Sequence, residues 1–425
     1  MSLPEPARWA IRTCPEADIV RSLCCWYYPS PRVTGNVEEA ISVIAETLAK
    51  WRQLGLAFIS DADGMRYYDP DEVINFCITA GLRGDDEYWF RFAAPLQIDM
   101  IHWFAGRSFT WQEVPEIRSL PQRGCRISFE RTYHPVAETV GNRLRLKLPL
   151  PLASPGFQID RLDLSSSEQG RLRQTGNFGE LVIVQDEARP VTIAFTVDAD
   201  VSPNLGTAEQ LGEEGRNLYT ARRENLIVVS PMIESLAETL AAGERDPEIL
   251  VDRYYRYIID QGIHGRVPYR ALDSEYPTDW PLLHGYYDCQ IGSGLLIALC
   301  RARAIPARLV NGYQIYHAYQ ANHFWAEVWL DGSWRPFDLC GWDAIKIQGG
   351  EGWLGCFAGQ TEYRMPLQCF PRSVLGPSSI SLRAPWQMIL CDDSSGTTTH
   401  YRDAFSQRPI FQDSISVDWF PVEAL

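Results

Sequence analysis

The chain has 425 residues, of which 45% are hydrophobic and 12% aromatic, and its formal net charge at pH 7 is −15. This length allows about two to four globular domains, and the negative charge argues against nucleic acid or an anionic membrane surface as a partner. No apolar run approaches the length of a membrane span. The 11 cysteines form no CxxC pair, which argues against a structural zinc site.

The first residues, MSLPEPARWA, contain no basic-then-apolar export signal. The cysteines are odd in number and irregularly spaced, which is typical of free thiols in a reducing compartment. We therefore expect a cytoplasmic protein that needs no metal or other cofactor.

Residues 1–118 are predicted to be mainly helical. Asn36 and Glu39 have the spacing of a capping box in front of apolar residues at helical intervals. A second helix is predicted to begin with Pro70 in its first position and to end near Gly81. No motif in this region indicates a function.

Between residues 120 and 228 the sequence changes to short strand-like runs separated by Pro, Gly and Asn. Leu144, Leu146 and Leu148 alternate with basic residues, as expected for a half-buried strand. We predict a β-sandwich-like domain in this part of the chain, ending in a charged connector.

Two helices are predicted next, because Ser230-Pro231 and Asp246-Pro247 each combine a capping residue with a proline in the first helical position. A third helix is predicted to begin at Cys289, directly after Asp288, which is a good N-cap residue. A thiol in the first turn lies at the positive end of the helix dipole, which is expected to lower its pKa. Cys289 is therefore a candidate nucleophile.

Three strands are predicted after this helix, at residues 307–316, 323–330 and 334–339. Asp331-Gly332 predicts a two-residue type I′ turn between the last two strands. The register set by that turn makes His323 and Asp338 diagonal neighbours on one face, within reach of a hydrogen bond. The other face of the middle strand is apolar and is expected to face the core.

Together these residues form a candidate Cys-His-Asp triad. His323 would take the thiol proton of Cys289 and later give it to the leaving group. Asp338 would orient the imidazole and stabilise its charged form. Two other histidines, His284 and His317, are expected to be loop residues, and Glu327 is expected to form a structural ion pair with Arg308.

Three sequence blocks carry a resemblance to a known family: DCxxxxxLLIALCRAxxIPARLV (288–310), NHFWAEVWL (322–330) and WRPFD (334–338). In this order they resemble the core of the transglutaminase-like cysteine enzymes, a papain-like superfamily. The resemblance implies that Cys289, His323 and Asp338 are catalytic. The sequence departs from the family at Ala304, where a glycine is usual, and at Phe324, where a small residue often follows the histidine.

The resemblance implies an α+β fold, in which a nucleophile helix packs on an antiparallel sheet. The strand-rich region before the core resembles the β-domain of bacterial transglutaminase-like proteins. We therefore expect four parts: a mainly helical N-terminal region of unknown role (1–118), a β-sandwich-like domain with its connector (120–228), the transglutaminase-like catalytic core (229–345) and a C-terminal β and loop extension of the core (346–425).

Aromatic residues surround the expected site in sequence. Trp280, Tyr286 and Tyr287 precede the nucleophile, and Trp325 shares the face of His323. They are candidate substrate-binding residues, but they would equally serve to fill the seam between sheet and helix. The backbone N–H of Cys289 is expected to be one oxyanion-hole donor, with Trp280 as a candidate for the second.

A Cys-His-Asp site forms an acyl-thioester, and the group that resolves it sets the activity. An amine gives a transglutaminase or amide synthase, and water gives a protease or amidase. We expect transfer from a peptide, amide or thioester donor, including a donor on a carrier protein, to an amine. The alternatives are a hydrolase, a catalytically silent binding scaffold and, with less support, a metal site at the triad.

Overall fold

The structure is a computed structural model that describes most of the central part of the chain. Apart from short gaps, the described residues are 13–19, 37–76, 123–133, 144–201, 211–339, 364–370, 391–398 and 411–421. They form a mixed α+β structure with several antiparallel sheets. None of the helices among these residues is long and apolar enough to cross a membrane.

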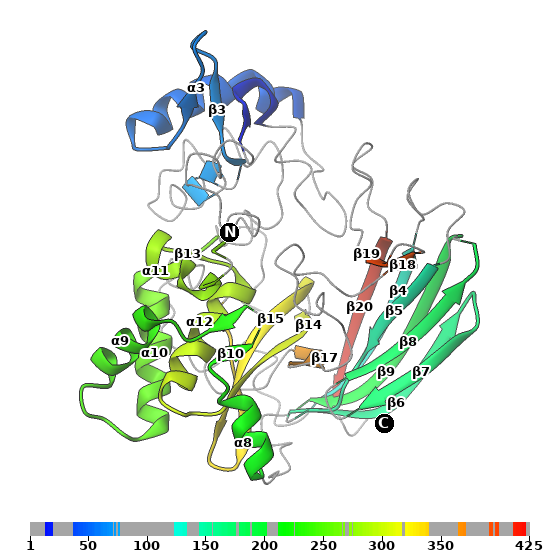
Figure 1. The fold of residues 1–425 in the computed structure, drawn as a ribbon. Coiled ribbons are helices and arrows are strands. Elements are labelled where there is room, and N and C mark those ends of the chain that lie inside the picture. The colour runs from blue at the N-terminus through cyan, green and yellow to red at the C-terminus, as the bar shows by residue number, and fades with distance from the viewer. Residues whose placement is uncertain are drawn as a thin grey trace.

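The helix that begins at Cys289 lies between a sheet and two other helices. Each of the three helices follows a residue whose side chain accepts a hydrogen bond from a backbone N–H of the first turn, and these caps are Ser230, Asp246 and Asp288. The helices are α9 (Pro231–Ala241), α10 (Pro247–Gln261) and α12 (Cys289–Ala302). α12 packs against α9 and α10 on one side and against the sheet on the other (Figure 1).

Three antiparallel strands carry the histidine and lead to the aspartate of the candidate triad: β14 (Ala307–Tyr316), β15 (Tyr319–Leu330) and β16 (Ser333–Phe337). Asp331 and Gly332 have φ angles of 48° and 78°, as a type I′ turn requires. Leu330 pairs with Ser333, so the predicted register is confirmed.

The third strand is shorter than predicted, because it ends at Phe337 rather than at 339. The hydroxyl of Tyr255 on α10 donates a hydrogen bond of 2.7 Å to the backbone carbonyl of Asp338. This carbonyl therefore bonds to a helix instead of continuing the ladder to β15.

The strands β14, β15 and β16 are part of a larger sheet. Its order is β16-β15-β14-β17-β8-β5, with β7 also paired to β8. The additional strands are β17 (Arg364–Cys369), β8 (Phe178–Gln185), β5 (Leu144–Leu150) and β7 (Gly170–Thr175). A strand from the C-terminal part of the chain thus joins the strands after the nucleophile helix to strands from the region before it.

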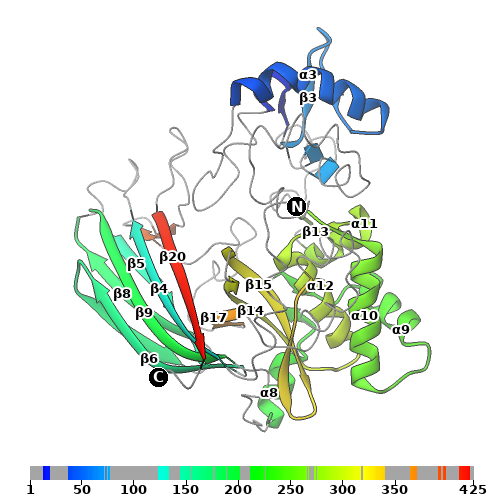
Figure 2. The same ribbon diagram turned by 180° about the vertical axis from the view of Figure 1, so that it is seen from behind.

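A second sheet has the order β20-β4-β9-β6, and its strands are β20 (Phe411–Pro421), β4 (Arg123–Tyr133), β9 (Val191–Val201) and β6 (Phe157–Ser166). Alternate residues of β9 are buried. Phe129 of this sheet contacts Tyr313 of β14, with ring centroids 5.6 Å apart. In Figure 2 the strands β14 and β15 lie between the helices and this second sheet. The sequence does not show whether the C-terminal extension covers the site or extends a sheet; in the structure its described strands β17 and β20 each join one of the two sheets.

The N-terminal region contributes helix α3 (Val37–Gln53) and a small sheet of β1 (Cys14–Pro15), β3 (Arg66–Tyr68) and β2 (Ile59–Ser60). The predicted second helix is described only in part, and its predicted end near Gly81 lies outside the described residues. The remaining short elements are α8 (Glu213–Tyr219), β10 (Arg223–Glu224), β11 (Ile227–Val228), β12 (Ile263–His264), α11 (Trp280–His284), β13 (Tyr286–Tyr287), β18 (Cys391–Asp393) and β19 (Gly396–Thr398).

Candidate active site

Cys289 is the first residue of α12, as predicted. The carboxylate of Asp288 caps the helix by accepting hydrogen bonds of 3.1 and 2.8 Å from the backbone N–H groups of Gln290 and Ile291. The residues from Gln290 to Arg301 are buried, whereas Cys289 is partly exposed. The cap therefore fixes the helix start and leaves the cysteine at the edge of the core.

The first turn of α12 packs closely on its neighbours because it contains Gly292. A Cβ at this position would lie 2.6 Å from the ring of Tyr287 and 3.2 Å from Leu339. Leu339 directly follows Asp338, so this close packing holds the start of the nucleophile helix next to the end of β16.

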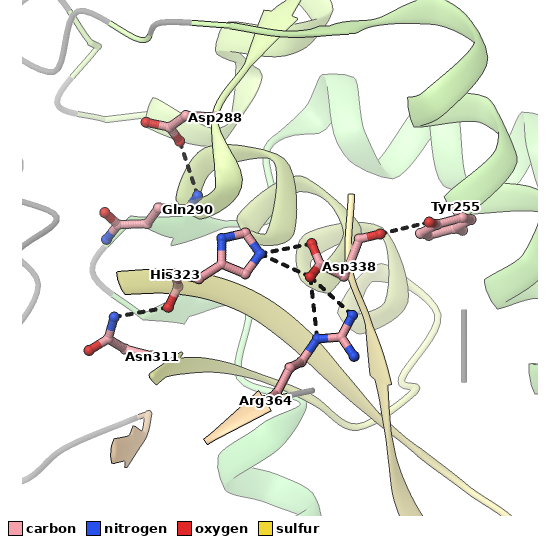
Figure 3. A network of polar contacts seen from close by, with 7 residues as sticks. All are labelled: Tyr255, Asp288, Gln290, Asn311, His323, Asp338 and Arg364. Carbon is pink, nitrogen blue, oxygen red and sulfur yellow. Dashed lines mark hydrogen bonds and ion pairs between the residues drawn. The ribbon is translucent and has the colours of Figure 1, made fainter. Parts of the chain in front are cut away.

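His323 and Asp338 form a buried pair. The Nε2 atom of His323 lies 2.9 Å from both carboxylate oxygens of Asp338, and the two residues are 3% and 0% exposed. Figure 3 shows the other ring nitrogen on the side away from Asp338, facing the start of α12. Because Nε2 is engaged by the carboxylate, Nδ1 is the nitrogen available for proton transfer.

The sulfur of Cys289 lies beside the strand that carries the histidine. It accepts hydrogen bonds from the backbone N–H groups of Gln290 and of Phe324, the residue that follows His323. The start of α12 thus lies against the strand that carries His323, the partner of Asp338.

The pKa of the Cys289 thiol is raised, so the predicted lowering by the helix dipole is wrong in its net direction. Burial of the sulfur is the largest cause, because it disfavours the thiolate. The negative charges of Asp288 and Asp338 add to it, and the two backbone N–H groups oppose it. The thiol therefore rests protonated and needs a base.

The Asp338 carboxylate has a second partner that sequence reasoning did not find. Arg364 of β17 places Nη2 and Nε 3.0 and 3.3 Å from Oδ2 of Asp338. The backbone carbonyl of His323 in turn accepts a hydrogen bond of 3.0 Å from Asn311, whose own oxygen accepts one of 3.0 Å from Gln368 of β17. Nothing in the local sequence around Arg364 or Gln368 marks them, since only the pairing of β17 with β14 brings them to the site.

The aromatic candidates differ in their exposure. Tyr287 is fully buried, and Trp325 is 1% exposed and stacks at 6.3 Å from the ring of His323. Trp280 is buried with its ring 3.7 Å from that of His284, and its indole N–H has no hydrogen-bond partner within the described residues. Tyr286 is partly exposed. Tyr287 belongs to the main core with the residues of α12, whereas Trp325 packs in a separate cluster with Leu152, Val310 and Cys369. Of the two, only Tyr287 therefore fills the seam between helix and sheet.

The predicted ion pair between Arg308 and Glu327 is present. The Nε and Nη2 atoms of Arg308 lie 2.8 and 2.7 Å from Oε2 of Glu327. A cavity of about 350 Å³ lies at the C-terminal end of α12. Its lining includes Ala304, Ile305, Pro306 and Trp329. Because α12 is about 21 Å long, this cavity at its far end is separate from Cys289.

The structure thus combines a capped cysteine at a helix start with a buried His-Asp pair on an α+β framework. The model of the Transglutaminase-like superfamily matches residues 234–339. This part of the chain is a transglutaminase-like domain, and the resemblance inferred from the three sequence blocks is confirmed.

Solved structures show more distant likenesses. A candidate cysteine protease from Cytophaga hutchinsonii is 12% identical, with a TM-score of 0.47 over 71% of this chain and 91% of that chain. The periplasmic domain of TgpA from Pseudomonas aeruginosa is 16% identical, with a TM-score of 0.31 over 56% of this chain and 94% of that chain. A TGase is 14% identical, with a TM-score of 0.21 over 42% and 45% of the two chains. None of these likenesses is close enough to indicate an activity. No curated protein matches the chain in sequence.

Proposed function

We propose that the protein is a cysteine acyltransferase that carries an acyl group as a thioester on Cys289 and transfers it to an amine. The observation that supports this most directly is the position of Cys289 at the capped start of α12, beside the strand of His323, whose ring is held through Nε2 by Asp338. The core would have the papain-like arrangement of helix and sheet, and the strands of residues 120–228, which belong to both sheets, would form the predicted β-sandwich-like domain.

The first half of the reaction makes the thioester. Nδ1 of His323 takes the proton of the Cys289 thiol while the sulfur attacks the acyl carbonyl, and Asp338 stabilises the imidazolium that forms. The backbone N–H of Cys289, at the positive helix start, is the proposed oxyanion donor. The indole N–H of Trp280, which has no hydrogen-bond partner in the part of the chain that the structure describes, is the candidate second donor. Collapse of the tetrahedral intermediate expels the leaving group, which takes the proton from His323.

The second half transfers the acyl group. The acceptor amine attacks the thioester carbonyl, gives a proton to His323, and expels the Cys289 sulfur, which regains a proton from the imidazolium. Water competes at roughly 55 M, whereas an oriented amine reaches effective molarities of about 10⁵ M. Burial of the ring of His323 favours an oriented acceptor over bulk water.

The partners follow from this chemistry. The donor would be a peptide, an amide or a thioester, including an acyl group on a carrier protein, and the acceptor would be a primary amine. We also propose a cytoplasmic location.

Intact-protein mass spectrometry tests the proposal. Incubation with a panel of acyl thioesters and peptide amides should add one acyl group to the wild type, and peptide mapping should place it on Cys289. Cys289→Ala should take up no acyl group and have no activity. Cys300→Ala is the matched control: its thiol is fully buried further along α12, so this variant should lose stability but keep acylation.

Titration with primary amines then separates transfer from hydrolysis. The amide product should increase with amine concentration at the expense of the free acid. Only free acid at every amine concentration would identify a hydrolase, and acylation of another cysteine would exclude the triad. No acylation by any donor, together with tight binding of one of them, would identify a silent scaffold.

A further inference from the structure

Arg364 contacts the triad from a strand outside the transglutaminase-like domain. Its guanidinium binds Oδ2 of Asp338 through two nitrogens, at 3.0 and 3.3 Å. The same oxygen lies 2.9 Å from Nε2 of His323 (Figure 3). Arg364 is 3% exposed and Asp338 fully buried, so solvent screens this interaction little.

The strand that supplies Arg364 is held in the sheet beside the histidine. β17 pairs antiparallel with β14, with Arg364 opposite Gln314. Gly312 is paired with His323 on one side and with Pro366 of β17 on the other. A Cβ on Gly312 would lie 2.1 Å from the carbonyl oxygen of Met365. The glycine thus permits the close approach that brings Arg364 to the carboxylate.

One oxygen of the Asp338 carboxylate therefore contacts two different side chains. It accepts a hydrogen bond from the imidazole that must change its charge during the reaction, and it pairs with a guanidinium whose charge is fixed. Because two nitrogens of the planar guanidinium contact the same oxygen, they hold Oδ2 from a fixed direction, which a single ammonium does not.

We propose that Arg364 is a positioning residue of the triad, which locks the Asp338 carboxylate against His323 and offsets its negative charge. The proposal rests on the proposed function for the catalytic role of the triad. It implies that the C-terminal part of the chain completes a site whose three reacting residues lie elsewhere.

The charge of Arg364 has a definite effect on pH dependence. A fixed positive charge lowers the pKa of every acid near it, so its removal makes the coupled Cys289–His323 pair hold its proton to higher pH. Among the described residues, Asp288 at the start of α12 and Tyr255 of α10 are the other titratable side chains that contact this part of the fold, and both stay in place in the Arg364 variants. Arg308 and Glu327, further along β14 and β15, are unchanged as well.

The test follows alkylation of Cys289 by iodoacetamide between pH 5 and 10, measured on the Cys289 peptide by mass spectrometry. This reading needs no acyl donor, so it is independent of whether a donor has been found. The variants are Arg364→Gln, which removes the charge, and Arg364→Lys, which keeps the charge but not the two-point contact. The control is Arg308→Gln, because Arg308 is also buried and carboxylate-paired on the same sheet.

For Arg364→Gln we expect the midpoint of the alkylation profile to rise by about one pH unit or more. For Arg364→Lys we expect an unchanged midpoint and a plateau rate about ten times lower, because the carboxylate is no longer fixed. Arg308→Gln should reduce thermal stability and leave the midpoint unchanged. A wild-type midpoint in Arg364→Gln, or an equal shift in Arg308→Gln, overturns the proposal. If Arg364→Gln does not fold, Arg364→Lys decides alone, since a wild-type plateau rate in that variant overturns it as well.

Discussion

Two buried arginine–carboxylate pairs lie in one sheet of this protein. Arg308 of β14 pairs with Glu327 of β15, and its guanidinium lies 4.1 Å from the ring centroid of Trp334. Arg364 of β17 pairs with Asp338. Both arginines and both carboxylates are less than a tenth exposed. The chemistry of the two contacts is therefore nearly the same.

The pairs differ in what else the carboxylate contacts. Asp338 also binds the imidazole of His323, a group that gains and loses a proton in the proposed reaction, whereas the charge-bearing partner of Glu327 is an arginine. The Arg308–Glu327 pair, whose carboxylate has an arginine as its charged partner, contributes to the specificity and rigidity of the sheet. The Arg364–Asp338 pair also sets the charge next to the imidazole of His323 and the orientation of its ring. The third partner, and not the ion pair itself, decides whether a buried arginine affects chemistry.

The largest expected effect separates the two carboxylates. Asp338→Asn should lower kcat/KM by about 10²- to 10⁴-fold with the fold retained, because the amide cannot stabilise the imidazolium. The kcat/KM of His323→Ala should be lower still, since this variant lacks the proton acceptor itself. Glu327→Gln should keep activity within about threefold of the wild type. The measurement is the rate of thioester formation together with the circular dichroism spectrum of each variant.

If Glu327→Gln lost as much activity as Asp338→Asn at equal stability, the contact with His323 would not distinguish the two arginine–carboxylate pairs. Wild-type rates in both Asp338→Asn and His323→Ala would instead exclude the triad.

The difference between the pairs also shows where sequence reasoning succeeds. The pairing of His323 with Asp338 depends on the two-residue turn at Asp331-Gly332, and the position of Cys289 depends on its neighbour Asp288. These are local signals with one geometric outcome, so the triad could be predicted.

Arg364 could not be found in this way. Its position depends on the pairing of β17 with β14, which joins residues about 50 positions apart through the close approach at Gly312. No local pattern encodes that pairing. The pKa of Cys289 was predicted in the wrong direction for a related reason: the helix start is a local feature, but burial of the sulfur depends on the packing of the whole site.

The next largest effect tests the attachment of β17. Gly312→Ala would bring a Cβ to within 2.1 Å of the Met365 carbonyl oxygen and 2.7 Å of the Trp325 ring. We expect a loss of about 3 kcal/mol in the free energy of unfolding, measured by urea denaturation, and a fall in activity as Arg364 moves from Asp338. The matched control is Gly332→Ala: at φ 78° it is also strained but has open space around it. That variant should lose stability without a change in the pH midpoint of Cys289 alkylation.

A smaller effect concerns a buried thiol outside the candidate site, in the second sheet, and the pH dependence of stability that it causes. Cys125 of β4 is fully buried, and burial raises its pKa to about 12. In the unfolded chain the pKa of a thiol is about 8.5. Because the folded value is higher, the full contribution of this thiol to the free energy of unfolding is present below about pH 8.5. This stabilisation decreases as the pH rises toward 12. Between pH 7 and pH 10 the wild type should therefore lose about 2 kcal/mol more than Cys125→Ala, measured by urea denaturation at both values. Equal losses in the two proteins would show that this thiol does not titrate with unfolding.

The smallest effect concerns the end of α12 that is far from the site. Ala304 has a φ of 55°, a left-handed conformation that costs an alanine about 1 kcal/mol and a glycine almost nothing. Glycine also gains entropy in the unfolded chain, which offsets about half of that benefit. Ala304→Gly should therefore raise the free energy of unfolding by about 0.5 kcal/mol and the melting temperature by about 1 °C. Ala302→Gly, at the last helical position of α12, should have the opposite sign, because glycine weakens a helix. Both variants should acylate Cys289 at the wild-type rate, since neither position touches either arginine pair. A decrease in stability for Ala304→Gly would show that the alanine side chain contributes packing that outweighs its backbone strain.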